Sequence, residues 1–325
     1  MKAIAQDRYG APTALELREV DRPVVGEHDV LVRVQAASAN PYDLHFMRGL
    51  PYIVRGARSA GFGIRGPRLP IRGRDLAGVV EAVGKHVTQL RPGDEVYGVG
   101  RGTFAGYACA SERELAPRPA NLTFVQAAAM PIAATTALEA IRNHGRVKPG
   151  QTVLVNGAAG GVGTFAVQIA KAFGADVTGV CSTRNVELVR SIGADHVIDY
   201  TAGDFTRGPN RYDLILDLVG NHSVSACRHA LVPHGTLLLS HGGRSTWFGP
   251  FGQILRALVM SRFVSQKLFA FTAHVTTEDL LALKELAEDG KVMPVIDRTC
   301  PLSEGSDAIR YLEGGHARGK VVITA

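Results

Sequence analysis

The segment Thr152–Phe173, TVLVNGAAGGVGTFAVQIAKAF, decides the fold of this chain. It begins with a short apolar run, Val153–Val155, which is typical of a strand buried on both faces. Four glycines follow, and then a helical pattern with apolar side chains up to Phe173. Such a unit needs residues without a Cβ, first to turn, then to let the backbone approach a pyrophosphate, then to pack the helix on the strand. Because a helix N-terminus offers free N–H groups and a partial positive charge to phosphates, the segment predicts a dinucleotide-binding site.

The end of the next apolar run indicates which dinucleotide binds. The run Val177–Val180 leads into Cys181-Ser182-Thr183-Arg184, about 20 residues beyond the glycines. An NAD site places Asp or Glu there to bind the ribose 2′-OH, whereas a cation accommodates the 2′-phosphate of NADP. No carboxylate occurs before Glu187, and two hydroxyls and a guanidinium stand in its place. The sequence therefore favours NADP(H), although Arg184 also suits a solvated position at the start of a helix.

The composition is that of an ordinary soluble enzyme with two domains. The chain has 325 residues, of which 46% are apolar and 20% charged. No apolar run is long enough to span a bilayer, and the first residues lack the apolar core of a signal peptide. The four cysteines are far apart and form no C-x-x-C, which indicates neither a disulfide framework nor a zinc knuckle. We expect a protein of the reducing cytoplasm.

The positive charge is concentrated in one segment. The net charge is +6, and Arg48–Arg74 contains seven arginines and no acid. This pattern indicates a local cationic feature and argues against a nucleic-acid-binding surface. Because glycines are interspersed among the arginines, we expect a mobile lid at the rim of the pocket that becomes ordered when cofactor or an anionic ligand binds. The alternative is solvated surface.

Hydrophobic periodicity divides the chain into a β-rich part and an alternating part. The β-rich part begins with predicted strands at Lys2–Gln6, Leu15–Val20, Asp29–Ala37, Asp75–Val83, Glu95–Val99 and Gly106–Ala116, with a polar turn and short helix near residue 40. Helices at Val125–Met130 and Ala133–Asn143 then lead into strands at Val153–Val155, Val177–Val180, His196–Asp199, Leu214–Asp217 and Thr236–Ser240. Strands that alternate with helices predict a doubly wound parallel sheet.

Five further segments complete the prediction. Thr276 and Asp279 resemble a capping box for a helix that runs to Asp289. A strand at Pro294–Cys300, a helix at Ser303–Glu313 and a last strand at Lys320–Thr324 finish the chain. For the apolar segment Phe251–Phe271 we expect a helix and a core strand that line a pocket or a subunit interface, and a membrane-surface helix is the alternative.

Several short motifs carry a resemblance that covers the chain nearly end to end. They are GRDLAGVVEAVG (Gly73–Gly84), RPGDEVYG (Arg91–Gly98), Thr136-Ala137, NGAAGGVG (Asn156–Gly163), IGADHVIDY (Ile192–Tyr200) and GKVVI (Gly319–Ile323). In this respect the chain resembles the medium-chain dehydrogenase/reductase superfamily, and NGAAGGVG, SANPYDLH and CSTRN are most similar to its NADP-dependent, quinone-oxidoreductase-like branch.

The resemblance implies an α/β fold with two domains. A GroES-like β-rich catalytic domain would comprise residues 1–122 and 296–325, and a doubly wound Rossmann NADP-binding domain residues 123–295. The cofactor would lie in the cleft between them.

Departures from the family pattern bear on the chemistry. Zinc alcohol dehydrogenases of the superfamily carry a cysteine at the position of Asn40 and a histidine–glutamate pair at Arg74-Asp75, and the four-cysteine lobe expected after Val99 is missing. Zinc requires thiolate, imidazole or carboxylate ligands, and an arginine supplies none. Without a Lewis acid to stabilise an alkoxide, we expect an acceptor that takes a hydride unaided, such as a quinone or a C=C conjugated to a carbonyl.

The resemblance also implies site residues. Asn40, Tyr42 and Asp43 would face the nicotinamide; Asn40 would hydrogen-bond a substrate oxygen, and Tyr42 or Tyr52 would donate a proton to a developing enolate. In the alternative interpretation, Asn40 belongs to a turn, both tyrosines pack, and Asp43 only starts a helix. The residues expected to contact the cofactor are Thr136, Gly157, Ala158, Ala159, Gly160, Gly161, Val162, Gly163, Ser182, Thr183, Arg184, Tyr200, Gly220, Ser240, His241, Gly242, Gly319 and Lys320.

The sequence thus predicts an NADPH-dependent, zinc-independent oxidoreductase that transfers hydride to a quinone or an α,β-unsaturated carbonyl. The alternatives are a metal-free carbonyl reductase or alcohol dehydrogenase, and a non-catalytic NADPH-sensing protein. We expect a small-molecule substrate, no nucleic acid, no stable membrane association, and a homodimer, with a monomer as the alternative.

Overall fold

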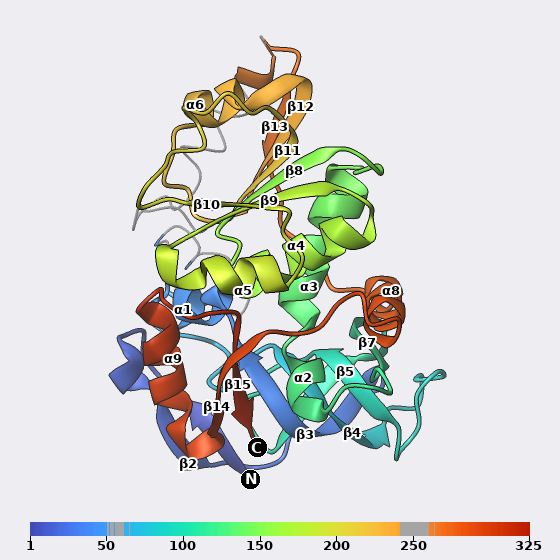
Figure 1. Ribbon diagram of the computed structural model, residues 1–325. Coiled ribbons are helices and arrows are strands. Elements are labelled where there is room, and N and C mark those ends of the chain that lie inside the picture. Colours follow the sequence, from blue (N-terminus) through green and yellow to red (C-terminus); the bar gives the residue numbers. More distant parts are fainter. Residues whose placement is uncertain (51, 53–54, 56–61, 65, 241–259, 263) are drawn as a thin grey trace. The chain divides into compact units, whose positions relative to one another are not determined.

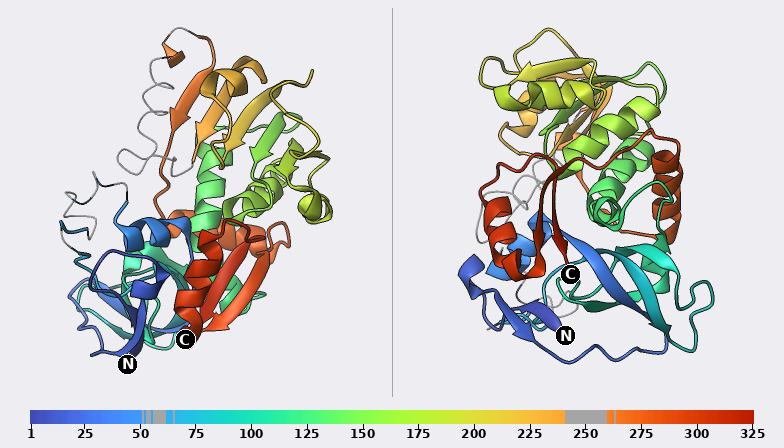
Figure 2. Two further views of the ribbon diagram at one scale, coloured as in Figure 1. Left: turned by 90° about the vertical axis from the view of Figure 1, so that its left-hand side faces the viewer. Right: turned by 60° about the horizontal axis from the view of Figure 1, so that its bottom comes forward.

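The computed structural model describes residues 1–325 except 51, 53–54, 56–61, 65, 241–259 and 263. The chain divides into two compact units (Figure 1). Unit 1 comprises Met1–Thr135, His274–Asp289 and Pro294–Ala325, and unit 2 comprises Thr136–Ala273 and Gly290–Met293. Both chain termini belong to unit 1, where they lie close together (Figure 2).

Unit 2 is built on a six-stranded parallel sheet with the order β10-β9-β8-β11-β12-β13. Its strands are β8 (Thr152–Asn156), β9 (Asp176–Cys181), β10 (His196–Asp199), β11 (Tyr212–Asp217), β12 (Leu231–Leu239) and β13 (Lys267–Ala270). The chain runs outward from β8 to β10 and then crosses back to β11, which is the strand order of a Rossmann fold. The predicted doubly wound sheet is confirmed, and its switch point lies between β8 and β11.

Helices cover this sheet. They are α4 (Gly161–Ala172), α5 (Val186–Ser191) and α6 (Val224–His229), with the 3-10 turn η6 (Thr183–Asn185) before α5. Helix α3 (Pro131–Leu138) begins in unit 1, ends in unit 2 and continues as the π-helix η5 (Glu139–His144), which packs on α4. Helix α4 packs on β8 and β9, α5 on β9 and β10, and α6 on β12. Phe165 and Val167 of α4 are completely buried, as the apolar pattern of this helix predicts.

Unit 1 is built on a seven-stranded mixed sheet with the order β14-β15-β3-β4-β5-β7, in which β6 also pairs with β3. Its strands are β3 (Asp29–Ala39), β4 (Asp75–Val83), β5 (Glu95–Val99), β6 (Tyr107–Ser111), β7 (Leu115–Pro117), β14 (Ile296–Pro301) and β15 (Lys320–Thr324), and β1 (Lys2–Ala5) forms a separate antiparallel pair with β2 (Glu16–Glu19). The C-terminal strand β15 thus joins an N-terminal sheet beside β3.

The helices of unit 1 are α1 (Pro41–Arg48), α2 (Phe124–Ala128), α8 (Thr277–Glu288) and α9 (Gly305–Glu313), and the 3-10 turns are η1 (Pro12–Ala14), η4 (Glu112–Glu114) and η7 (Leu302–Glu304). The predicted cap of α8 is present, because Thr276 accepts the backbone N–H of Asp279. Helix α9 packs on β14 and β15.

The compact units differ from the predicted domain bounds at 122/123 and 295/296. Helix α2 packs on β3, β4, β5 and β15, which places the boundary after Thr135. Helix α8 packs on β7, and Leu280 O of α8 accepts the hydroxyl of Tyr97 in β5, so this helix also belongs to unit 1. A helix belongs to the sheet that its apolar face covers, and the order of elements along the chain does not reveal which sheet that is.

Two predicted strands have different bounds in the structure. The segment Gly106–Ala116 is not one strand, because η4 separates β6 from β7. Strand β12 begins at Leu231, five residues before the predicted start at Thr236. Its pairing with β11 shifts register between Tyr212 and Leu214, so the strand continues past an interruption that the sequence marks with Pro233 and Gly235.

The structure describes only part of the arginine-rich segment Arg48–Arg74. Three of its described arginines are paired with an acid or buried, and are not simply solvated. Arg58 and Arg65 lie outside the described residues, as do residues 51, 53–54, 56–57 and 59–61 of the proposed lid, so the lid stays a prediction. Arg48 forms an ion pair with Glu313, and Arg74 lies 3.5 Å from Glu114. Arg72 is only 3% exposed, which is not solvated surface.

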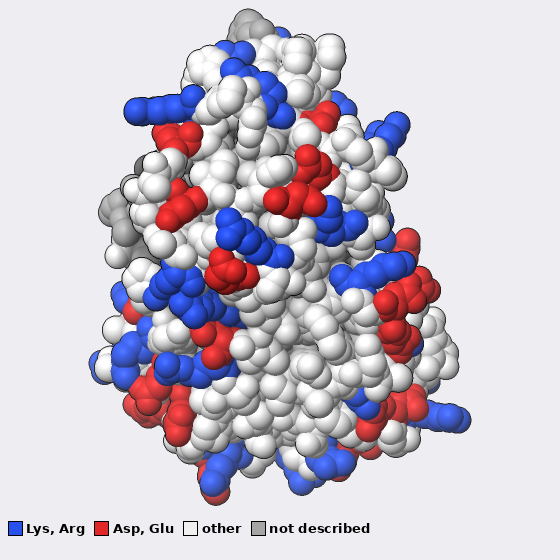
Figure 3. All heavy atoms as spheres, viewed as in Figure 1, with Lys and Arg blue, Asp and Glu red and all other residues white. Residues whose placement is uncertain are grey.

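Charges of both signs are interspersed over the face of the molecule drawn in Figure 3. The excess of positive charge therefore forms no continuous basic surface on that face. In the described part of the chain, we find no helix with the length and apolarity that a bilayer span requires.

Candidate functional site

The glycine turn between β8 and α4 has the geometry that the sequence predicts. Gly157 adopts a φ of +95°, a conformation that favours glycine. A Cβ on Gly163 would lie 2.1 Å from Gly157 O, so at this position the helix is in direct backbone contact with the turn that follows β8. At Gly160, the N-cap of α4, a Cβ would meet only Gly157 O at 3.4 Å. No side chain caps α4, and the N–H groups of its first turn remain available to a phosphate.

Two buried polar residues hold the switch point together, and sequence reasoning missed both. Asn156 ends β8 and Asp217 ends β11, and Asn156 Nδ2 donates to Asp217 Oδ1 at 2.8 Å. The same carboxylate oxygen accepts the backbone N–H groups of Val219 (3.1 Å) and Gly220 (2.9 Å). These bonds fix the turn after β11 beside the glycine turn. In the sequence, both residues can be recognised as a polar residue at the last position of an otherwise apolar strand.

The residues predicted near the 2′-phosphate follow adjacent strands. Ser182, Thr183 and Arg184 follow β9, Tyr200 follows β10, and the N–H of Tyr200 bonds to Cys181 O at 3.0 Å. Thr183, Arg184 and Tyr200 are exposed, so they are accessible to a ligand.

One acid that the sequence analysis did not weigh stands beside them. Asp199 ends β10, and its Oδ1 accepts the N–H and the hydroxyl of Thr201 at 2.9 and 2.8 Å. Hydrogen bonds, first of all with the Thr183 side chain, hold the pKa of Asp199 below its ordinary value. This carboxylate is therefore already bound to the protein.

Of the other predicted cofactor residues, Ser240 lies at the same edge of the unit 2 sheet, whereas Thr136 lies in α3 and Gly319 in unit 1. Ser240 follows β12, and its N–H bonds to Asp217 O at 3.0 Å, which places it beside Gly220 at the carboxyl ends of the strands. Thr136 is 8% exposed in α3. His241 and Gly242 lie outside the described residues. Gly319 has a φ of +88° and packs against the backbone of Val295 in unit 1.

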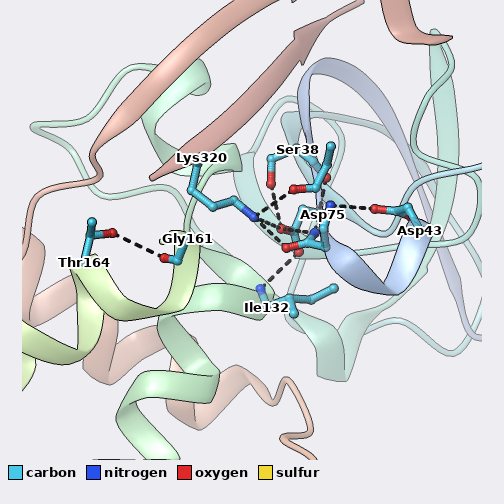
Figure 4. Close-up of polar contacts among 9 residues, drawn as sticks. Ser38, Asp43, Asp75, Ile132, Gly161, Thr164 and Lys320 are labelled. Carbon is cyan, nitrogen blue, oxygen red and sulfur yellow. Dashed lines mark hydrogen bonds and ion pairs between the residues drawn. The ribbon is translucent and has the colours of Figure 1, made fainter. Parts of the chain in front are cut away.

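A buried polar cluster occupies unit 1, and we define it as Ser38, Asn40, Asp75 and Lys320 (Figure 4). Asp75 Oδ2 accepts the Ser38 hydroxyl at 2.7 Å and Asn40 Nδ2 at 2.8 Å, and Asp75 Oδ1 accepts the N–H of Ile132 at 3.0 Å. Lys320 Nζ donates to Asn40 Oδ1 at 2.5 Å and lies 3.5 Å from Asp75 Oδ2. The residues meet because β3 lies between β4 and β15 in the sheet.

This cluster engages the side chains that were expected to face ligands. Asn40 Nδ2 donates to Asp75 and, at 3.3 Å, to Ser38 O, so neither N–H is free for a substrate oxygen. The ammonium of Lys320 is directed to Asn40 and Asp75, and burial lowers the pKa of Lys320. A role of Asn40 in binding a substrate oxygen stays a prediction, since the amide oxygen accepts from Lys320 and the amide N–H groups donate to Asp75 and Ser38 O.

The N-terminus of α1 holds the remaining candidates. Asp43 Oδ2 accepts the N–H of Asn40 at 2.8 Å, which is the helix-start role considered for it, and burial raises the pKa of Asp43 to about 7. Tyr42 is 39% exposed, and burial raises its pKa, so its hydroxyl is protonated at neutral pH. Tyr52 is also 39% exposed, and the Arg55 guanidinium lies 4.6 Å from its ring centroid.

These residues do not provide a ligand set for zinc. At the two positions where the family resemblance implies zinc ligands, this chain has the amide of Asn40 and the guanidinium of Arg74, and a guanidinium is no zinc ligand. The ammonium of Lys320 has no lone pair and would repel a dication placed beside Asn40 and Asp75. Across the described residues, no group of three His, Cys, Asp or Glu side chains could hold a metal ion.

Comparisons with known proteins agree with this architecture. Residues 26–120 match a family model described as the alcohol dehydrogenase GroES-like domain, and residues 192–323 match one described as zinc-binding dehydrogenase. The chain is 36% identical to 2-methylene-furan-3-one reductase of Solanum lycopersicum, with 99% of this chain and 79% of the relative covered. It is 34% identical to the mitochondrial NAD(P)H oxidoreductase RTN4IP1 of Bos taurus, with 99% and 89% covered.

The fold is also that of solved structures. The quinone oxidoreductase from Coxiella burnetii superposes with a TM-score of 0.87 at 30% identity, with 100% of this chain and 99% of that chain covered. End-to-end similarity at this level, together with the Rossmann strand order and the GroES-like unit, settles the classification. The chain belongs to the medium-chain dehydrogenase/reductase superfamily of oxidoreductases, in its quinone-oxidoreductase-like branch.

Proposed function

We propose that this chain transfers hydride from NADPH to a quinone or an α,β-unsaturated carbonyl without zinc. The observation that carries the proposal is the Lys320 ammonium, held at 2.5 Å from Asn40 Oδ1 and 3.5 Å from Asp75 Oδ2. A fixed cation at these positions leaves no place for a dication that would activate an alcohol. The names of the tomato and Coxiella relatives point to the same acceptors, a methylene group conjugated to a ketone and a quinone.

The choice of NADPH is supported by the residues after β9. Ser182, Thr183 and Arg184 offer hydroxyls and a cation, and the last two are exposed. The nearby carboxylate of Asp199 already accepts two hydrogen bonds from Thr201. A free acid that would favour the 2′-OH of NAD is therefore missing among the described residues of this turn.

The bound cofactor would supply the hydride. The residues of the chain would bind and orient it, with the turn Gly157–Gly163 and the first turn of α4 at the pyrophosphate. After hydride addition to the β-carbon, the enolate oxygen or α-carbon needs one proton to give the saturated carbonyl. Tyr42 is our candidate for that proton, since its hydroxyl is protonated at neutral pH and its side chain is partly exposed. Tyr52 is the alternative donor.

Location and assembly stay predictions. We propose a cytoplasmic homodimer, although the bovine relative is named as a mitochondrial protein.

An acceptor screen after dialysis against a chelator tests the proposed function. We expect NADPH oxidation with quinones and enones, slower reaction with NADH, and little reaction with alcohols or simple aldehydes. Reduction of aldehydes alone would indicate a metal-free carbonyl reductase. Tight NADPH binding without turnover of any acceptor would indicate the NADPH-sensing protein.

A further inference from the structure

Arg72 is a buried cation whose position is set by the backbone. It lies just before β4 and is only 3% exposed. Its N–H bonds to Ile4 O at 3.2 Å, and its carbonyl accepts the N–H of Phe104 at 2.9 Å. The next residue, Gly73, has a φ of +94°, and a Cβ there would come within 2.5 Å of Phe104. The chain is thus held on both sides of Arg72, which fixes where its side chain begins.

Aromatic rings fix the other end of this side chain. The Arg72 guanidinium carbon lies 4.7 Å from the centroid of the Phe46 ring, which is a stacking distance. Phe46 in turn contacts Phe62 and Tyr42, at centroid distances of 4.1 and 5.5 Å. All of these residues belong to unit 1. The guanidinium therefore lies beside the proposed proton donor, Tyr42.

One complete edge of the guanidinium has no partner. Nε and Nη2 of Arg72 are both enclosed and make no hydrogen bond. These two nitrogens share the side edge of the group, where their N–H bonds run parallel and match the two oxygens of a carboxylate. An enolate or quinone presents a single oxygen at a time, so the geometry favours a carboxylate.

The protein does not fill this edge with an acid of its own. Arg48 and Arg74 have Glu313 and Glu114 as partners, but among the described residues Arg72 has no such ion pair. Asp43 acts on the charge of Arg72, yet its Oδ2 already accepts the N–H of Asn40. Burial lowers the pKa of Arg72 only to about 10, so the group is charged at neutral pH. Keeping an unpaired charge buried costs free energy, which a bound anion would recover.

We propose that Arg72 is the carboxylate-binding residue of the acceptor pocket. The substrate class would be a conjugated carbonyl compound that carries a carboxylate, and the carboxylate would bind to Nε and Nη2 of Arg72 beside Tyr42. The assignment of the carboxylate to the acceptor rests on the proposed function.

Matched substrates test the proposal through activity. We would compare 4-phenyl-3-buten-2-one with its 4-carboxyphenyl counterpart, using NADPH and the whole chain. Arg72→Met is expected to lower kcat/KM for the carboxylated enone about ten- to a hundredfold, mainly through KM, and to leave the neutral enone nearly unchanged. Arg72→Lys keeps the charge but loses the double donor edge, so its loss should be smaller. Arg310→Met removes an exposed partner of Asp307 on α9, outside the arginine-rich segment, and should affect neither substrate.

Stability separates ligand binding from a structural role. Methionine in place of an unpaired buried cation should leave the Tm unchanged or raise it. A lower Tm, together with equal losses on both enones, would show that Arg72 supports the fold and would overturn the proposal.

Benzoate provides a test that does not depend on turnover. It should raise the Tm of the wild-type protein and not that of Arg72→Met, whereas benzyl alcohol should affect neither. This result would stand even if no enone or quinone were reduced, in which case only the proposed function would fail. No response of the wild-type protein to benzoate would show that Nε and Nη2 of Arg72 do not bind a carboxylate and would overturn the proposal.

Discussion

Lys320, Arg72 and Arg184 are three cations in three different environments. Lys320 is buried with partners, Arg72 is buried without them, and Arg184 is exposed after β9. Burial and pairing, more than charge alone, decide what each side chain contributes. Lys320 should therefore affect stability, Arg72 ligand selection, and Arg184 the choice of cofactor.

Removal of the Lys320 ammonium should be costly. Lys320→Met leaves the carboxylate of Asp75 buried without its cation, and breaking such a pair costs about 3–5 kcal/mol. We expect urea unfolding to show this loss, and the double variant Lys320→Met/Asp75→Asn to recover part of it. Lys284→Met, which removes a more exposed partner of Glu288, should cost less than about 1 kcal/mol. Equal losses in Lys320→Met and Lys284→Met would show that the buried pair is not important for stability.

Arg184 should distinguish the two cofactors. Arg184→Ala is expected to weaken the binding of NADPH about ten- to a hundredfold, because a charge-assisted contact is worth about 1.5–3 kcal/mol. The affinity for NADH should stay nearly unchanged. Isothermal titration with both cofactors measures this. Arg190→Ala, on the exposed side of α5 beside Glu187, is the control. If the affinity for NADH falls as much as the affinity for NADPH, Arg184 supports the fold and does not bind the phosphate.

Asp43 should make stability depend on pH. Its pKa is about 7 in the folded protein and 3.8 as the reference value, so the folded state binds this proton more tightly than the unfolded state. The stabilisation is fully present below about pH 4 and is lost as the pH rises through about 7, with a slope of at most about 1.4 kcal/mol per pH unit. In Asp43→Asn this loss should disappear. Urea unfolding at several pH values measures it, and parallel curves for both proteins would contradict the prediction.

At the scale of elements, the unit β8–turn–α4 shows why part of the fold was predictable. Local chemistry determines it: an apolar strand, a φ of +95° at Gly157, and a helix that must touch the strand at Gly163. The bounds of β4, β5, β10 and β15 likewise agree with the predicted ones, because alternation or Pro-Gly turns mark their ends.

The glycines of this turn should separate folding from cofactor binding. Gly163→Ala places a Cβ 2.1 Å from Gly157 O, and overpacking of this kind costs about 1–3 kcal/mol. At Gly160 the nearest atom lies at 3.4 Å, so Gly160→Ala should fold normally but bind NADPH more weakly, since the added Cβ hinders the approach of the pyrophosphate. Thermal unfolding and cofactor titration measure the two effects. Normal stability in Gly163→Ala would contradict this assignment.

The features that the sequence did not reveal depend on long-range contacts. Lys320 meets Asn40 across 280 positions of the chain, and the guanidinium of Arg72 stacks on the ring of Phe46, which lies 26 positions before it. The same holds for α2 and α8, which join unit 1 because of the sheet surface they cover. Local patterns report turns and buried faces, but they do not report which distant residue completes a hydrogen bond.

For the whole molecule, our proposal has two halves: the Rossmann unit binds the hydride donor, and in the GroES-like unit the ammonium of Lys320 leaves no place for a metal ion beside Asn40 and Asp75. The first half is supported by the strand order and the glycine turn. The second half depends on Lys320 and on the amide and guanidinium at Asn40 and Arg74. Together they predict hydride transfer that needs no metal.

A single-turnover reaction with NADPH deuterated at nicotinamide C4 tests this claim most directly. The protein would first be treated with chelator, and elemental analysis should find far less than about one zinc per chain. With 4-phenyl-3-buten-2-one as acceptor, we predict that one deuterium from one face of the nicotinamide appears at the β-carbon of the saturated ketone. Loss of the reaction after chelation, with recovery on addition of about one equivalent of zinc, would show that hydride transfer needs the metal.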